Sequence, residues 1–273
     1  MAKFKLSAFS DEYAKELDSQ IEGLVKNKVK MTELRGVDGI NVSDLTVMQA
    51  MNVKSKLDAF GIGVSAIGSP IGKIKITDPM EPHLDKLKQT CEVAEIMGTR
   101  RIRMFSFYIP GTDHAIWRQK VIDQMSAMLQ AADGTGVQLC HENEKGIYGD
   151  IASRCEEIHK EFPQLRAVFD PANFIQCGQD TKEAWKKLEP YVEYMHIKDA
   201  TADGSVVPAG KGIGNLPYLL ENYKGSVLTL EPHLSVFDGF DKLEASEKTK
   251  MGYCYPSSGA AFDAAVNALK ELL

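Results

Sequence analysis

Four short apolar segments of the sequence each end in an ionisable residue. These residues are Glu142, Asp170, His196 and Glu231. A parallel strand that is buried on both faces is a continuous apolar run, so a polar group at its C-terminal end faces a loop or a cavity. Three carboxylates in one poorly solvated pocket repel one another unless a cation neutralises them. Because carboxylates and an imidazole suit Mn2+, Mg2+, Co2+ or Zn2+, we predict that these four residues bind one divalent metal ion.

Each of the four residues, taken singly, also has an ordinary structural explanation. Asp170 before Pro171 suits a turn, and Glu142 suits a cap for the segment that follows it. Taken together, these explanations require four coincidences, because neighbouring strands of a barrel direct one residue each toward a common centre. A shared metal site accounts for all four positions at once.

The elements that position these residues follow from an alternation of apolar strands and amphipathic helices. We predict strands at residues 5–10, 31–36, 63–69, 101–107, 137–143, 165–170, 192–198 and 227–231. We predict helices at residues 11–28, 45–60, 83–97, 117–132, 150–162, 181–188, 216–223 and 257–273. Eight alternations predict an α/β fold, a single (β/α)8 TIM barrel over residues 1–273, with its active site at the C-terminal ends of the strands. An open doubly wound sheet is the alternative, but it calls for a glycine-rich turn after the first strand, where Ser10-Asp11-Glu12 stands.

Composition narrows the partners and the compartment. The net charge is −6 and the pI is near 5.6, which disfavours non-specific binding to nucleic acid. No apolar run is long enough for a membrane span or a signal peptide, and the five cysteines are scattered without a C-x-x-C pair. We expect a cytoplasmic protein with a small-molecule partner. The long irregular stretch at residues 234–256 is either a lid, a contact between subunits of a homo-oligomer, or a mobile surface loop.

The chain resembles a known family, the xylose isomerase-like TIM barrels, over nearly its whole length. This family of sugar phosphate isomerases and epimerases includes ketose 3-epimerases, hydroxypyruvate isomerases, inosose dehydratases and endonuclease IV. The segments that carry the resemblance are residues 137–143, 169–173, 194–199, 210–214 and 228–233. The resemblance implies the same four metal ligands, with Glu142 and Glu231 also acting as an acid/base pair. The chain departs from many members at Asn173, where they have a histidine, so the resemblance implies no one substrate.

These residues predict one kind of chemistry. A divalent ion that holds two adjacent oxygens of a hydroxy-ketone or hydroxy-aldehyde acidifies the C–H bond between them and stabilises the enediolate that forms. Glu142 and Glu231 belong to non-adjacent strands, so a carboxylate on each face of the substrate removes and returns a proton. We predict a metal-dependent isomerase or epimerase that acts on a sugar or a sugar phosphate.

Six further residues are expected to contact the substrate: Glu33, Arg35, Arg103, Asn173, Lys198 and His233. Lys198 is two residues after His196 and so faces the same side of the strand, whereas His141 points out of the barrel by the same alternation. The candidates for contact with a phosphate or a carboxylate are Arg35, Lys73, Lys198 and Lys211. The glycine-rich residues 210–214 are expected to cover the substrate, because they lack the Lys-Ser or Lys-Thr signature of a phosphate loop.

Three other functions stay open. A dehydratase acting on a keto-polyol would use the metal ion to stabilise an enolate before hydroxide is lost. An abasic-site endonuclease of this fold needs several more histidine ligands and a basic groove, whereas this chain has six histidines in all and a negative net charge. A non-catalytic carbohydrate-binding barrel needs the site but not two opposed carboxylates.

Overall fold

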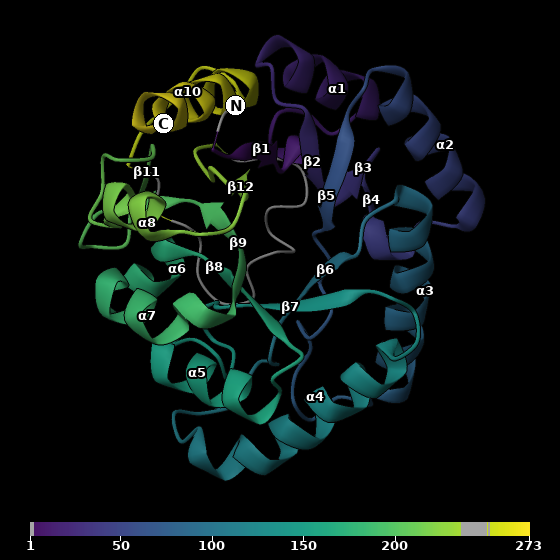
Figure 1. Ribbon diagram of the computed structural model, residues 1–273, viewed down its shortest axis with the longest axis vertical. Helices are drawn as coiled ribbons and strands as arrows, with labels where there is room; N and C mark the ends of the chain where they lie inside the picture. The colour runs from purple at the N-terminus through teal and green to yellow at the C-terminus, as the bar shows by residue number, and fades with distance from the viewer. Residues whose placement is uncertain (1–2, 236–249, 251) are drawn as a thin grey trace.

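The computed structural model describes residues 3–235, 250 and 252–273, and it shows a closed barrel of eight strands (Figure 1). The strands are β1 (Lys5–Ala8), β2 (Met31–Leu34), β5 (Gly63–Ile67), β6 (Arg101–Met104), β7 (Gln138–Glu142), β8 (Arg166–Phe169), β9 (Val192–Ile197) and β12 (Val227–Leu230). Their order around the barrel is β1-β12-β9-β8-β7-β6-β5-β2, and all neighbours pair in parallel. The predicted (β/α)8 TIM barrel is confirmed.

Helices connect the strands and form an outer ring (Figure 1). They are α1 (Leu17–Lys26), α2 (Val47–Ala59), α3 (Glu81–Met97), α4 (Arg118–Ala132), α5 (Ala152–Glu161), α6 (Pro171–Gln176), α7 (Thr181–Leu188), α8 (Leu216–Asn222) and α10 (Ser258–Leu272). The shorter elements are η1 (Ser10–Glu12), η2 (Val42–Asp44), η3 (Ala115–Trp117), η4 (Glu189–Tyr191), and two small hairpins, β3 (Gly36–Val37) with β4 (Ile40–Asn41) and β10 (Asp199–Ala200) with β11 (Val206–Val207). Helix boundaries follow local signals: Thr46 and Gln49 form a capping box at the start of α2, and Gly98 ends α3 with φ 71°.

The structure departs from the predicted helices at two places. A helix is predicted over residues 11–28, but the short η1 comes first and α1 begins at Leu17. Asp11 in η1 accepts a hydrogen bond of 2.8 Å from Arg35 Nε, which fixes this segment against the residue after β2. After β8 the chain forms the unpredicted α6. Pro171 begins this helix, and the carboxylate of Asp170 caps it by accepting the backbone N–H of Asn173 at 2.9 Å.

Inward-facing side chains fill the barrel in layers. One layer is a small apolar cluster, made of Ala66, Cys140, Val168, Tyr194 and Val227. Side chains alternate along a strand, so the residues two positions after Cys140, Val168 and Tyr194 also face inward. Those residues are Glu142, Asp170 and His196. The apolar layer thus supports a layer of ionisable groups at the C-terminal ends of the strands.

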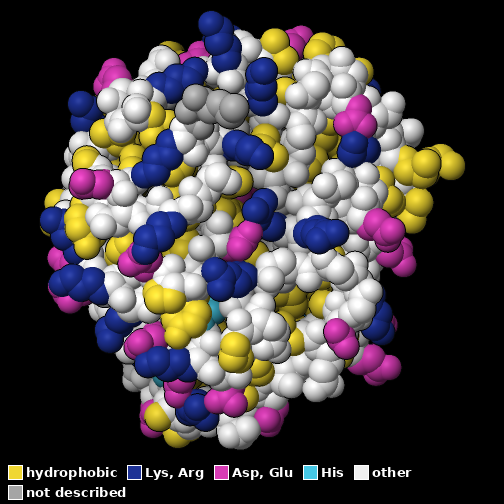
Figure 2. Space-filling view, viewed as in Figure 1, with side chains coloured by type: hydrophobic (Ala, Val, Ile, Leu, Met, Phe, Trp, Pro, Cys, Tyr) yellow, Lys and Arg dark blue, Asp and Glu magenta, His cyan; other side chains and the backbone are white. Residues whose placement is uncertain are grey.

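The outer surface mixes charged and apolar side chains. Figure 2 shows acidic and basic groups spread over one face, with hydrophobic side chains protruding over α2. Met48 and Met51 of that helix have exposed fractions of 73% and 58%. None of the described helices is long and apolar enough to cross a membrane. The predicted lid or subunit contact at residues 234–256 lies mostly outside the described residues; within its described part, the carbonyl of Lys250 accepts a 2.7 Å hydrogen bond from Val206 of β11.

Candidate metal centre

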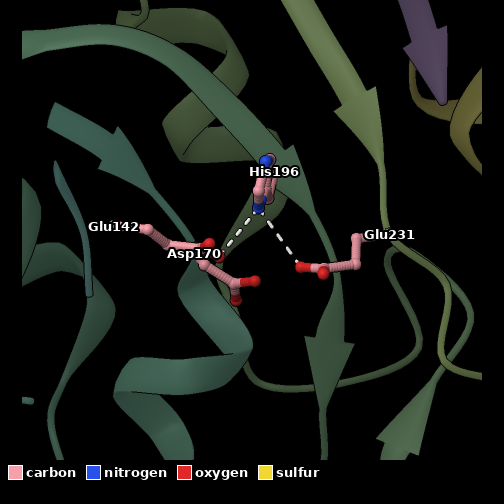
Figure 3. A group of neighbouring side chains, drawn as sticks. All are labelled: Glu142, Asp170, His196 and Glu231. Atoms are coloured by element: carbon pink, nitrogen blue, oxygen red, sulfur yellow. Dashed lines mark hydrogen bonds and ion pairs between the residues drawn. The ribbon is translucent and has the colours of Figure 1, made fainter. Parts of the chain in front are cut away.

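The four predicted metal ligands meet at the ends of four adjacent strands, β7, β8, β9 and β12. Figure 3 shows the side chains of Glu142, Asp170, His196 and Glu231 directed toward a common centre. One candidate ligand atom from each residue lies within 4.8 Å of the others. All four residues are buried. The structure therefore brings together the residues that the strand pattern singled out.

His196 lies between carboxylates on both sides of its ring. Its Nδ1 atom is 2.8 Å from Glu142 Oε1 and 3.2 Å from Glu231 Oε2. Its Nε2 atom is 3.1 Å from Glu33 Oε2, and the Tyr194 hydroxyl donates to the other Glu33 oxygen at 2.8 Å. Burial opposes protonation, but the neighbouring carboxylates raise the pKa of His196 well above its usual value. The protonated ring donates from both nitrogens, and a metal ion at Nδ1 would replace one of these protons.

The donor set fits a divalent cation. Glu142 Oε2 and Asp170 Oδ2 are buried, and neither accepts a well-aligned hydrogen bond from a described residue. Two cationic groups lie close to them instead, Arg103 Nη1 at 3.2 Å from Glu142 and Lys198 Nζ at 2.9 Å from Asp170. Burial raises the pKa of Asp170 to about 7 with help from the charge of Glu231, although Lys198 opposes the rise. Mutual repulsion among buried carboxylates is what a divalent ion relieves, and carboxylate with imidazole is a suitable ligand set.

Two asparagines hold Asp170 in place. The side chain of Asn143 both donates to the carbonyl and accepts from the N–H of Asp170, each at 2.9 Å. Asn173 donates its side-chain amide to the carbonyl of Asn143 at 2.8 Å. Asn173 thus ties the exit of β8 to the exit of β7.

Three cationic side chains surround Glu231. Lys198 Nζ is 3.1 Å from its Oε2 atom, while Arg35 Nη1 and Arg103 Nη1 are 3.3 and 3.6 Å from its Oε1 atom. Both guanidinium groups lie over the ring of Phe9, at 4.2 and 5.0 Å from its centroid. Burial alone would raise the pKa of Glu231, but Lys198 and His196 bring it well below its usual value. Glu231 is consequently ionised at neutral pH.

A small pocket adjoins these residues, with about 20 Å3 of space for a water-sized molecule. It is lined by Arg35, Lys73, Arg103, Glu144, Lys145, Asn173, Gln176, Lys198, Glu231 and His233. Five of the six residues predicted to contact substrate belong to this lining. The sixth, Glu33, does not line it, because its fully buried carboxylate lies behind His196 and bonds to the far side of that ring.

The glycine-rich segment at residues 210–214 has a structural explanation in its contacts. The backbone N–H groups of Gly210, Gly212 and Gly214 donate to the Asp199 carboxylate at 3.0, 3.0 and 2.8 Å. A Cβ atom on Gly212 would lie 2.3 Å from the carbonyl oxygen of Ala200, so this turn requires glycine. The segment folds around an anion of the protein itself, and none of its residues is among those lining the pocket above.

Comparison with known proteins identifies the family of the chain. The sequence matches the family described as xylose isomerase-like TIM barrel over residues 29–235. The chain belongs to this family. No curated protein matches it in sequence.

Solved structures similar to this xylose isomerase-like barrel include enzymes of different kinds. The probable 3-DHS dehydratase AsbF from Bacillus anthracis is 16% identical, with a TM-score of 0.75 over 98% of this chain and 99% of that chain. The IolI protein with a bound zinc atom is 14% identical, with a TM-score of 0.75 over 98% of both chains. A D-psicose 3-epimerase crystallised in the presence of D-fructose is 15% identical, with a TM-score of 0.73 over 98% of both chains. At sequence identities this low, the similarity to these structures shows a shared fold and nothing further.

One buried residue beside this centre is not predicted by the sequence. Glu12 in η1 is buried, and its Oε2 atom accepts the backbone N–H of His233 at 2.8 Å. Burial raises the pKa of Glu12 to about 8, although the nearby Arg35 opposes the rise. His233 has a φ of 46°, and its Nε2 atom is 3.5 Å from Glu231 Oε1. A carboxylate after a first strand is common, so no local pattern marks Glu12; the contact spans 221 residues of sequence.

Proposed function

We propose that the protein is a divalent-metal-dependent isomerase or epimerase that acts on a sugar or sugar phosphate by proton transfer. The observation that carries this proposal is the placement of Glu142 and Glu231. Their carboxylates come from β7 and β12, which are not neighbours in the barrel, and both lie within 3.2 Å of the same nitrogen of His196. Two carboxylates that reach one point from different directions suit the removal of a proton from carbon and its return.

The residues around this point have different proposed roles in the reaction. A divalent ion held by the four ligands would supply Lewis-acid polarisation of a substrate carbonyl. Glu231 is ionised in the resting protein and so begins as a proton acceptor. Lys198 Nζ lies 2.9 Å from Asp170 Oδ2 and 3.1 Å from Glu231 Oε2. Its positive charge stands beside the position at which a substrate oxygen gains negative charge, where a fixed cation lowers the barrier.

A dehydratase is the second candidate. The specific observation in its favour is the likeness to the probable 3-DHS dehydratase, with a TM-score of 0.75 over nearly the whole of both chains. A dehydratase shares the first step, abstraction of a proton beside a carbonyl, and then expels hydroxide.

Endonuclease chemistry at a multinuclear zinc centre finds less support. Of the six histidines, His196 and His233 lie at this centre. His141 and His159 pack against each other with ring centroids 5.9 Å apart, between β7 and α5. His141 therefore faces the helical layer, as the alternation along its strand predicts. His83 accepts the backbone N–H of Gly72 at 2.7 Å.

Turnover in D2O, followed by NMR, tests the proposal. The metal-loaded protein is offered a panel of ketoses, ketose phosphates and keto-polyols. An isomerase or epimerase places solvent deuterium on the carbon beside the carbonyl and retains every oxygen, whereas a dehydratase forms an unsaturated product. Glu142→Gln and Glu231→Gln should each lower the rate by roughly 10²–10⁴-fold, or more if the metal ion is lost. A product without solvent deuterium, or a Glu142→Gln protein of normal rate, contradicts the acid/base roles.

A further inference from the structure

The wall of the pocket is strongly cationic. Five lysine and arginine side chains line it, against two carboxylates. One of these carboxylates is Glu231, whose charge a bound metal ion would neutralise. Glu144 is then the single acidic residue in a lining that also contains Arg35, Lys73, Arg103, Lys145 and Lys198. Arg35, Arg103 and Lys198 are balanced by carboxylates behind the lining, so among the lining residues the excess of positive charge over Glu144 lies with Lys73 and Lys145. A neutral sugar does not call for this excess.

Lys73 and Lys145 stand apart from the other cations by their position in the fold. Arg35, Arg103 and Lys198 contact ligand carboxylates, so their charge bears on the metal centre and the reacting atoms. Lys73 comes from the segment between β5 and α3, and Lys145 comes from the segment between β7 and α5. Both lysines line the pocket from loops beyond the strand ends, where a substrate would place the end that does not react.

The backbone around Lys73 is held firmly. The N–H of Phe105 donates to the carbonyl of Ile71 at 2.8 Å, and the N–H of Phe107 donates to the carbonyl of Gly72 at 3.0 Å. Gly72 has a φ of 87°, and a Cβ atom there would lie 2.0 Å from the carbonyl oxygen of Phe105. The segment can pass this closely beside the exit of β6 because residue 72 is glycine.

The Lys73 side chain is itself restrained. Its ammonium group lies 4.3 Å from the centroid of the Phe105 ring and 2.9 Å from Glu144 Oε2, and the side chain is 8% exposed. A lysine that is already ordered loses little side-chain entropy when it binds a ligand.

We propose that the substrate carries an anionic group, a carboxylate or a phosphate, bound by Lys73 and Lys145 at the end remote from the metal centre. The incoming anion takes over part of the contact that Glu144 makes with Lys73, forming charge-assisted hydrogen bonds. This inference rests on the proposed function, because it takes the pocket as the substrate site.

Isothermal titration calorimetry with matched probes tests the anionic subsite. The protein loaded with Mn2+ is titrated with D-fructose, D-fructose 6-phosphate and D-fructuronate, which differ only at the sixth carbon. At least one anionic probe should bind ten or more times more tightly than D-fructose, and the preferred probe separates phosphate from carboxylate. Equal or weaker binding of both anionic probes, or no binding of either, overturns the proposal.

Three variants test whether Lys73 is responsible for the preference for an anionic probe. Lys73→Met should remove most of the preference for the anionic probe, by about tenfold or more, as expected for a charge-assisted hydrogen bond. Lys75→Met removes the same charge from an exposed position two residues away and should leave the preference unchanged. Glu144→Gln should strengthen anion binding, because it removes the competing carboxylate. If Lys73→Met and Glu144→Gln change anion binding in the same direction, the ion pair between Lys73 and Glu144 has only a structural role. That result would contradict an anion-binding subsite at Lys73.

Calorimetry separates this inference from the proposed function. It records binding without turnover, so the anionic preference is measured whether or not deuterium enters the product. A protein that exchanges deuterium but prefers D-fructose keeps the proposed function and loses the subsite. A protein that prefers the anion but exchanges no deuterium keeps the subsite and loses the acid/base roles.

Discussion

His196 has a carboxylate on each ring nitrogen, and this arrangement decides which nitrogen faces the centre. Glu33, 3.1 Å from Nε2, is backed by the Tyr194 hydroxyl at 2.8 Å. With the Nε2 proton held by Glu33, Nδ1 is the nitrogen that faces Glu142 and Glu231, and it is the one that would bind a metal ion after losing its proton. A carboxylate behind a metal-binding imidazole fixes its tautomer and raises its basicity, which is how such groups support metal affinity.

Replacing Glu33 with glutamine should weaken metal binding by roughly 10–100-fold, because the ring loses its charged hydrogen-bond partner. Competition with a coloured chelator measures this affinity without reference to turnover. Tyr194→Phe should have the same sign and a smaller effect, since it removes only the donor to Glu33. Glu22→Gln, at an exposed position of α1, serves as the control. An unchanged affinity in Glu33→Gln would return Glu33 to the substrate-binding role that the sequence suggested.

At the level of elements, strand parity was the most informative signal in the sequence. Inward-facing Cys140 and Tyr194 precede Glu142 and His196 by two positions, so the alternation alone places both ionisable groups in the barrel. Alternation along β2 does not separate Glu33 from the pocket residues, because it gives the face of the strand and not the depth of the layer. Glu33 faces inward but lies beneath the pocket.

Contacts between distant segments explain what the sequence did not show. The η1 segment departs from the predicted first helix because Asp11 bonds to Arg35, 24 residues away. The Gly210–Gly214 run looked like a cover for substrate, yet it folds around Asp199. Both segments depend on partner residues that become neighbours only when the barrel closes. The local sequence pattern therefore cannot predict these contacts.

The segment between β5 and α3 provides a stability test at this scale. Gly72→Ala meets both a φ of 87° and the Phe105 carbonyl at 2.0 Å from the new Cβ atom. We expect the free energy of unfolding in urea to fall by about 2–5 kcal/mol, from left-handed strain and a backbone clash together. Gly111→Ala has a φ of 74° and no atom within 4 Å, so it isolates the conformational part, about 1–2 kcal/mol. Equal losses in the two variants would show that the close approach to Phe105 contributes nothing.

For the whole molecule, buried neutral histidines predict sensitivity to acid. Burial lowers the pKa of His159 to about 4. Its Nδ1–H donates to the carbonyl of Leu165 at 3.3 Å, and its Nε2 atom is buried without a hydrogen-bond partner among the described residues. The unfolded chain, with a pKa near 6.5, binds a proton between pH 6.5 and 4 that the folded chain refuses. Stability therefore falls as the pH falls through this window.

Urea unfolding at pH 7 and pH 4.5 measures this contribution. His159→Gln keeps a donor for Leu165 but cannot take up a proton. It should lose roughly 2–3 kcal/mol less on acidification than the wild type, from about 1.4 kcal/mol per unit of pKa shift. His114→Gln, at a partly exposed position, should lose as much as the wild type. The same acid sensitivity in His159→Gln and wild type would remove His159 as a source of the effect.

The central claim for the molecule is that four strand ends of the barrel hold one divalent ion. Metal analysis by mass spectrometry after reconstitution with Mn2+, Mg2+, Co2+ or Zn2+ tests it most directly. We predict one equivalent per chain in the wild type and in a His114→Ala control. His196→Ala and Asp170→Ala should each retain less than about a tenth of that amount while keeping the circular dichroism of the folded barrel. Equal metal content in the wild type and in these two folded variants would contradict the account.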